Sequence, residues 1–98
     1  MSYLTGTIST EIAGTTSLPL TVADGEAMIT LDVVSNGTHN NSRMTLQHSP
    51  DGVNWLSSQQ TTNGNGSITL PLATAYARAC VVRGEGSAQT ANIFITAK

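Results

Sequence analysis

The sequence predicts an all-β protein, folded as a single antiparallel β-sandwich of about eight short strands. Turn-forming residues recur about every ten positions, and apolar and polar residues alternate between them, as in strands with one buried face. The composition agrees, because the chain has 15 Thr, 10 Ser and 7 Asn, whereas charged residues make up only 10%. Threonine favours strands, and Ser and Asn favour turns, so the outer faces should be rich in hydroxyl groups rather than ions.

The length of 98 residues predicts one domain, covering residues 1–98. A chain of this size buries about two thirds of its unfolded surface, which suffices for one core between two sheets. The pattern does not distinguish an immunoglobulin-like strand order from a jelly roll, because both consist of short strands with similar spacing.

Eight segments carry the strand pattern. They are residues 3–12, 17–22, 27–34, 43–49, 53–60, 67–72, 75–83 and 89–97. Pro19 and Pro71 lack a backbone donor and therefore predict edge positions, whereas Gly6 predicts a bend or bulge in the first segment. The last two segments are expected to form a closing antiparallel pair around the glycine-rich turn 84–87.

The stretch SPDGVNW, residues 49–55, predicts a tight hairpin turn that leads into the chain's single tryptophan. Pro50 presets φ at its turn position, and Gly52 supplies the positive φ that closes the corner. We expect Trp55 to anchor the edge of the core between the two sheets, so that Pro50, Gly52 and Trp55 are structural residues. The alternatives are a metal loop, for which Asp51 alone supplies too few oxygen ligands, and an exposed aromatic platform for a ligand.

Charge and motifs argue against nucleic-acid, membrane, metal and catalytic functions. The four basic residues are too scattered to follow phosphates, and neither a signal peptide nor an apolar run of the ~20 residues that span a bilayer is visible. His39, in a polar loop expected over 35–42, and His48, at a strand end, lack the ligand spacing of a zinc site. Cys80 is mid-strand, where a cysteine is usually a small buried group rather than a nucleophile. We therefore expect no metal, no cofactor and no enzymatic activity.

The strand expected over 75–83 has an unusual outer face. If the small residues at 77, 79 and 81 face the core, the opposite face carries Tyr76, Arg78, Cys80 and Val82. This face mixes one charge with apolar neighbours. Either another chain half-covers it, or Arg78 lies along a solvated sheet with its charged end in water. Tyr76 and Arg78 are therefore candidate partner-binding residues.

Residues 42–98 resemble a pattern of phage virion β-sandwich proteins. In that pattern a strand leads into S-x-D-G-x-x-W, and a later strand carries an aromatic residue, an arginine and small apolar residues before a final Thr/Ala-rich strand. The matching positions here are Ser49, Asp51, Gly52, Trp55, Tyr76 and Arg78. The resemblance implies a non-enzymatic structural subunit, such as a capsid decoration (cement) protein or a tail component.

The first strand provides a second set of candidate contacts. The Thr-rich stretch SYLTGTIST belongs either to an assembly arm, over residues 1–14, that adds to a neighbour's sheet edge, or to an ordinary edge strand of its own sandwich. Its candidate partner-binding residues are Tyr3, Leu4 and Ile8.

From the resemblance and the surface composition we expect a decoration subunit made in the host cytoplasm and located on the capsid exterior. It would bind the major capsid protein and assemble with copies of itself, with a trimer favoured. The alternatives are a phage tail component, a carbohydrate-binding module that stacks sugars on Trp55 and Tyr76, and an enzyme that uses Cys80.

Overall fold

The computed structural model describes residues 1–37 and 41–98, so His39 of the expected polar loop lies outside the described residues. Eight strands and no helix are found in these ranges, and hence no helix that could cross a membrane. The strands are β1 (Ser2–Ser9), β2 (Leu20–Thr21), β3 (Met28–Ser35), β4 (Arg43–Ser49), β5 (Leu56–Asn63), β6 (Gly66–Pro71), β7 (Tyr76–Arg83) and β8 (Thr90–Ala97). The predicted all-β class and number of strands are confirmed.

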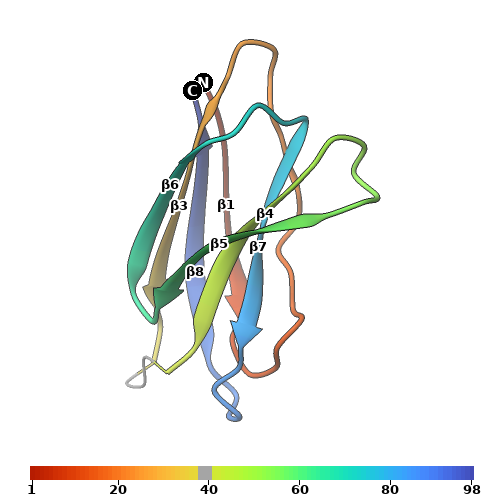
Figure 1. The fold of residues 1–98 in the computed structure, drawn as a ribbon. Helices are drawn as coiled ribbons and strands as arrows, with labels where there is room; N and C mark the ends of the chain where they lie inside the picture. Colours follow the sequence, from red (N-terminus) through yellow and green to blue (C-terminus); the bar gives the residue numbers. More distant parts are fainter. Residues whose placement is uncertain (38–40) are drawn as a thin grey trace.

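The strands form a sandwich of two antiparallel sheets (Figure 1). The first sheet has the order β1-β8-β3-β6, and the second sheet has the order β2-β7-β4-β5. Four antiparallel pairs join the first strand to the last and continue inward along the chain: β1/β8, β2/β7, β3/β6 and β4/β5. The same pairs result when one long hairpin folds over to form both sheets. This is a jelly-roll order, because an immunoglobulin-like sandwich would pair its first strand with its second.

The predicted pairing of the last two strands is wrong. β7 belongs to the second sheet, whereas β8 lies in the first sheet between β1 and β3. The glycine-rich turn 84–87 therefore connects the two sheets instead of closing a hairpin. Turn residues predict that the chain changes direction, but burial of the whole strand selects its neighbours. The inward side chains of β8, at positions 91, 93, 95 and 97, are almost completely buried there.

The core lies between the sheets and consists of inward-facing apolar side chains from both of them. Alternation along each strand places these residues inside, including Ala77, Ala79 and Val81 as predicted from β7. The largest fully buried apolar side chains are Ile29, Leu31, Met44, Leu46, Ile68, Ile93 and Ile95. Apolar strand faces thus define the interior and leave the alternate faces to solvent or to partners.

β1 is an edge strand of its own sandwich. It pairs with β8 over its whole length, from Ser2 opposite Ala97 to Ser9 opposite Thr90. Of the two alternatives considered for the N-terminal segment, the structure therefore shows the edge strand and not a detached arm. The bend expected at Gly6 is absent from the pairing, which runs through it without a shift in register.

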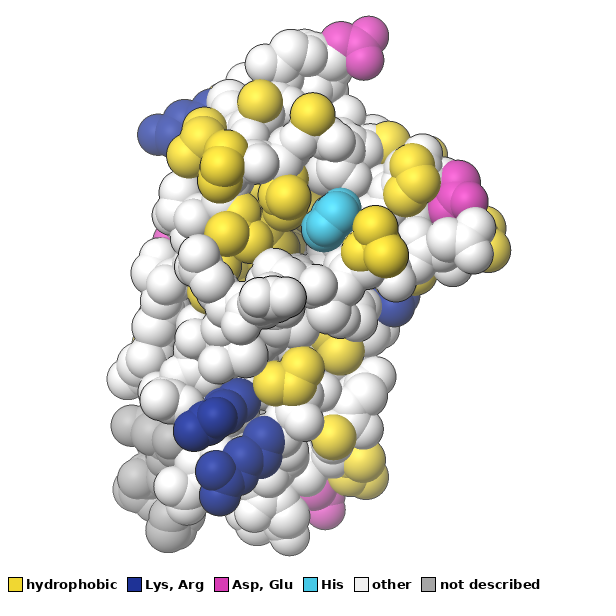
Figure 2. All heavy atoms as spheres, in the orientation of Figure 1, with side chains coloured by type: hydrophobic (Ala, Val, Ile, Leu, Met, Phe, Trp, Pro, Cys, Tyr) yellow, Lys and Arg dark blue, Asp and Glu magenta, His cyan; other side chains and the backbone are white. Residues whose placement is uncertain are grey.

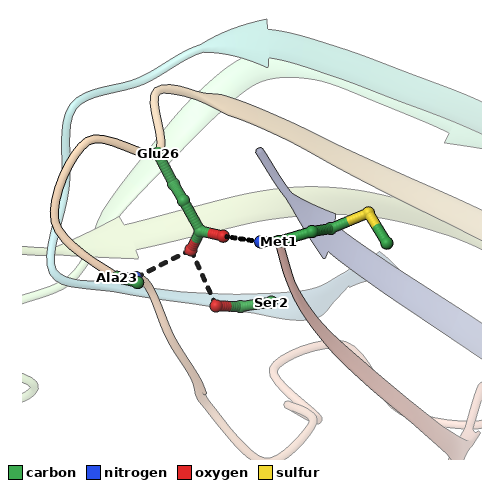
Figure 3. Close-up of polar contacts among 4 residues, drawn as sticks. All are labelled: Met1, Ser2, Ala23 and Glu26. Carbon is green, nitrogen blue, oxygen red and sulfur yellow. Dashed lines mark hydrogen bonds and ion pairs between the residues drawn. The ribbon is translucent and has the colours of Figure 1, made fainter.

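Glu26 holds the start of β1 in place (Figure 3). Its carboxylate accepts hydrogen bonds from Ser2 Oγ at 2.7 Å and from the Ala23 backbone N–H at 2.8 Å. The amino group of Met1 lies 3.1 Å from the other carboxylate oxygen. These contacts, the Ser2 hydrogen bond foremost, lower the pKa of Glu26 to about 2. The first strand is thereby tied to the turn before β3, with both ends of the chain side by side (Figure 1).

Candidate functional site

The turn between β4 and β5 is a self-contained hydrogen-bonded unit. The Asp51 carboxylate accepts hydrogen bonds from the backbone N–H groups of Val53 and Asn54, both at 2.8 Å, and from the Asn54 amide at 2.7 Å. The fully buried Ser49 hydroxyl donates to Asp51 Oδ1 at 3.0 Å and accepts from the Gly52 N–H at 2.8 Å. Gly52 has φ of 78°, which confirms the positive φ predicted for this corner.

The donors around Asp51 make its carboxylate a cap of the turn. The backbone N–H groups of Asn54 and Val53, helped by the Asn54 side chain, hold the pKa of Asp51 well below its usual range. Both carboxylate oxygens are therefore engaged inside the loop. No group of three metal-ligating side chains occurs within residues 1–37 and 41–98. The turn is thus a rigid scaffold whose polar groups are largely satisfied by its own residues.

Trp55 does not lie in the core, so the prediction of an anchor between the two sheets is wrong. It is absent from the core cluster, and its side chain is half-buried. The reason is the register of the hairpin. Leu56 pairs with His48, and alternation then turns Trp55 toward the outer face, the side of Gln47. Pro50 and Gly52, both exposed, form the corner that precedes Trp55.

Arg78 stacks on the outer-facing tryptophan. Its guanidinium carbon lies 4.0 Å from the centroid of the Trp55 ring, a cation–π distance. Its Nε donates to Gln47 Oε1 at 2.8 Å, and the Gln47 amide donates in turn to Ser57 Oγ at 3.0 Å. The guanidinium plane is therefore fixed by strands β4 and β5. Within the described residues, its terminal nitrogens have no hydrogen-bond acceptor.

Tyr76 lies next to this stack and contacts the turn. It shares the outer face of β7 with Arg78, and its ring lies against Gly52, where a Cβ atom would meet it at 3.4 Å. The side chains of Trp55, Tyr76 and Arg78 are each half-buried. We call Gln47, Gly52, Trp55, Tyr76 and Arg78 the outer-face cluster. It presents two aromatic rings and one arginine from two segments of the chain, the turn between β4 and β5 and strand β7.

Cys80 is buried, as predicted, but not in the core. It faces the same side of β7 as Arg78, is 7% exposed, and forms a bridge with Thr16 of the segment before β2. Burial raises the pKa of the Cys80 thiol, against the smaller opposing effect of Arg78. The neutral thiol is the less nucleophilic form, so these surroundings do not activate the residue.

The candidate residues of β1 lie apart from the outer-face cluster, because β1 belongs to the first sheet. Tyr3 is 70% exposed on the outer side of that sheet, whereas Leu4 is half-buried and packs against the core. Ile8 is a core residue with 4% exposure, so its side chain is almost fully covered in the isolated chain, and its role in binding a partner stays a prediction. Leu4 and Ile8 both point inward, because side chains alternate between the two faces of a strand, and Gly6 is the inward position between them.

Gln47 is a site residue that the sequence did not reveal. It is the cross-strand partner of Arg78 and positions the guanidinium. A polar residue in an alternating strand carries no signal of such a role until the pairing of β4 with β7 is known.

On the face of the molecule in Figure 2 few side chains are charged, and several hydrophobic side chains gather around the histidine. The outer-face cluster contributes two aromatic rings and one cation to a surface with few charges, since charged residues make up only 10% of the chain. No protein-family model matches the chain, and no curated protein matches it.

Proposed function

We propose that the protein is a non-enzymatic structural subunit that binds another protein through the outer-face cluster. The observation that carries this proposal is the stack of Arg78 on Trp55, 4.0 Å apart, beside the half-exposed Tyr76. Trp, Tyr and Arg are the residues most enriched at the energetic centres of protein interfaces.

The rigidity of the cluster strengthens the proposal. Ser49 and Asp51 hold the turn that carries Gly52, and Gln47 holds Arg78, before any partner arrives. Side chains that are already ordered lose less conformational entropy on binding. The terminal nitrogens of Arg78 are still available to donate to acceptors on a partner, at the centre of an aromatic patch.

We further propose that the partner is the major capsid protein of a phage head, and that the protein decorates the capsid exterior. The support is the resemblance to phage virion β-sandwich proteins. The six positions that carry this resemblance run from Ser49 to Arg78 in the sequence. In the structure they lie in or beside the turn between β4 and β5 and in strand β7. The fold alone does not decide between capsid and sugar binding, because jelly rolls serve in both viral capsid and lectin domains.

The test is binding of the purified protein to phage capsids that lack it. The native protein should bind, and Trp55→Ala should weaken binding by about 2 kcal/mol, roughly 30-fold. Thr69→Ala, on the outer face of the first sheet, is the matched control and should bind like the native protein. Equal binding by Trp55→Ala would remove the cluster from the interface. Antibody labelling of virions should decorate the head, and labelling of the tail alone would make the protein a tail subunit.

A carbohydrate-binding module is the alternative that the exposed aromatic rings favour. Arg78 already covers one face of the Trp55 ring, so only the other face could stack on a sugar. Titration with oligosaccharides separates the two functions. Saturable quenching of Trp55 fluorescence would support sugar binding, whereas an unchanged spectrum is expected for the protein-binding function.

A further inference from the structure

Among the edge strands of the two sheets, β1 alone is long, regular, uncharged and free of proline. In the second sheet, β2 has only two residues, and β5 shifts its register opposite Thr45–Gln47. In the first sheet, β6 ends in Pro71. β1 pairs with β8 over eight residues without any shift. Shortness, bulges, proline and charge are the features that keep an edge strand from pairing with another chain, and β1 has none of them.

Half of the backbone groups of β1 face this open edge. The N–H of Thr10 donates to the carbonyl of Gln89 at 3.0 Å, and bonded pairs alternate along an antiparallel ladder. The even-numbered residues of β1 therefore bind β8, and the odd-numbered ones turn their N–H and C=O groups outward. These outward residues are all exposed, and they are Tyr3, Thr5, Thr7 and Ser9.

A groove lined by both apolar and hydroxyl-bearing side chains runs along the same edge. Its volume is about 500 Å³, and the inward side chains of β1, Leu4 and Ile8, line it together with Ile93. The segment 15–18 forms the opposite wall and ends at Leu18, which is 76% exposed. The open hydrogen-bonding edge and this groove thus lie side by side, as a site for an added strand requires.

We propose that β1 pairs antiparallel with β1 of a second copy of this chain, about a twofold axis at Gly6. In this register the outward residues bond one another, with Thr5 opposite Thr7 of the second copy and Tyr3 opposite Ser9. On the inner side, Leu4 faces Ile8 of the second copy above the groove. The two first sheets join into one continuous sheet.

The strand itself indicates a second copy as the occupant. Under this twofold symmetry Gly6 meets its own copy and Thr5 meets Thr7, so a charge at position 5 or 7 would lie diagonally across the strands from the like charge of the second copy. β1 has no charge, and threonine pairs across strands are favourable. Gly6 lies on the axis, and no atom lies within 4 Å of the position that its Cβ would take. The twofold pairing replaces the trimer expected from the sequence and does not depend on the capsid function.

Sedimentation velocity or light scattering of the full chain tests the pairing. The native protein should have twice the mass of one 10.2 kDa chain. Thr5→Pro removes an outward N–H that β8 does not use, and should raise the dimer dissociation constant by about 30-fold or more. Thr5→Val keeps that N–H and should still form the dimer. Circular dichroism verifies that each variant is folded.

A charge exchange tests the register. The variant with Thr5→Lys and Thr7→Lys places lysines opposite each other and should be a monomer. The variant with Thr5→Lys and Thr7→Glu places opposite charges together and should remain a dimer. A native monomer at roughly millimolar concentration, a native trimer, or a dimer of the double-lysine variant would overturn the proposal. Capsid binding by folded Thr5→Pro should persist, which separates this interface from the outer-face cluster.

Discussion

The outer faces of the two sheets differ in how their side chains are used. On the first sheet, small polar side chains bond one another across strands, as in Thr30 with Thr69 at 3.0 Å and Ser67 with Asp32 at 2.6 Å. Larger side chains on the same face, such as Tyr3 and Phe94, are exposed. On the second sheet, Trp55 and Arg78 are large and half-buried, and they are held by residues behind them.

The difference shows that a low charge content does not make all surfaces alike. Exposed hydrogen bonds between small side chains contribute little to stability and offer little apolar area to a partner. A preformed aromatic and guanidinium cluster concentrates binding energy in a few side chains. Because its aromatic rings and arginine are held in place, the second sheet is the face on which we expect the partner protein of the proposed function, and the first sheet contributes its edge to the proposed dimer.

The largest effect on stability is expected at Asp51, which caps the turn under the cluster. Asp51→Ala should lower the free energy of unfolding at neutral pH, because several donors lose their acceptor. The folded-state pKa is depressed, so this stabilisation is present above the ordinary aspartate value of 3.8 and is lost as pH falls through the lower folded value. In urea unfolding the variant and the native protein should therefore converge in strong acid.

Asp24→Ala is the control for this pH dependence, because Asp24 is exposed in a turn and has no hydrogen bond in the described part of the chain. It should leave the free energy of unfolding nearly unchanged. A constant difference between Asp51→Ala and the native protein from neutral pH to strong acid would contradict the role of the carboxylate.

A smaller effect is expected for Ser49→Ala, compared with Ser67→Ala on the first sheet. Ser49 is completely buried, and its loss leaves the Gly52 N–H without its acceptor, at a cost of about 1–2 kcal/mol. Ser67 bonds Asp32 in solvent, and its loss should cost under about 0.5 kcal/mol. Chemical denaturation of both variants measures the difference. Equal losses would mean that the two faces do not differ in this way.

The smallest effect is the coupling between Trp55 and Arg78. A double-mutant cycle with Trp55→Ala and Arg78→Ala should give an interaction of about 0.5–1 kcal/mol in the free energy of unfolding. The cycle with Thr30→Val and Thr69→Val on the first sheet should give only about 0.2–0.5 kcal/mol. Additive losses at Trp55 and Arg78 would show that the ring and the guanidinium are merely adjacent.

The sequence alone was sufficient for features that depend on neighbours along the chain. Alternation predicted the inward set of β7, with Ala77 and Ala79 in the core, and the SPDG stretch predicted the corner at Gly52. These predictions succeed because side-chain periodicity and turn chemistry act within a few residues. The all-β class follows from the same local signals.

Tertiary structure alone decided which strands became neighbours and which way Trp55 points. A shift of one residue in the pairing of β4 with β5 would turn the indole to the opposite face, and no local signal specifies that register. The same holds for β8, whose turn is visible in the sequence but whose partners β1 and β3 come from the far end of the chain. Strand partners are chosen by the burial of complete apolar faces, which becomes available only when both sheets close on one core.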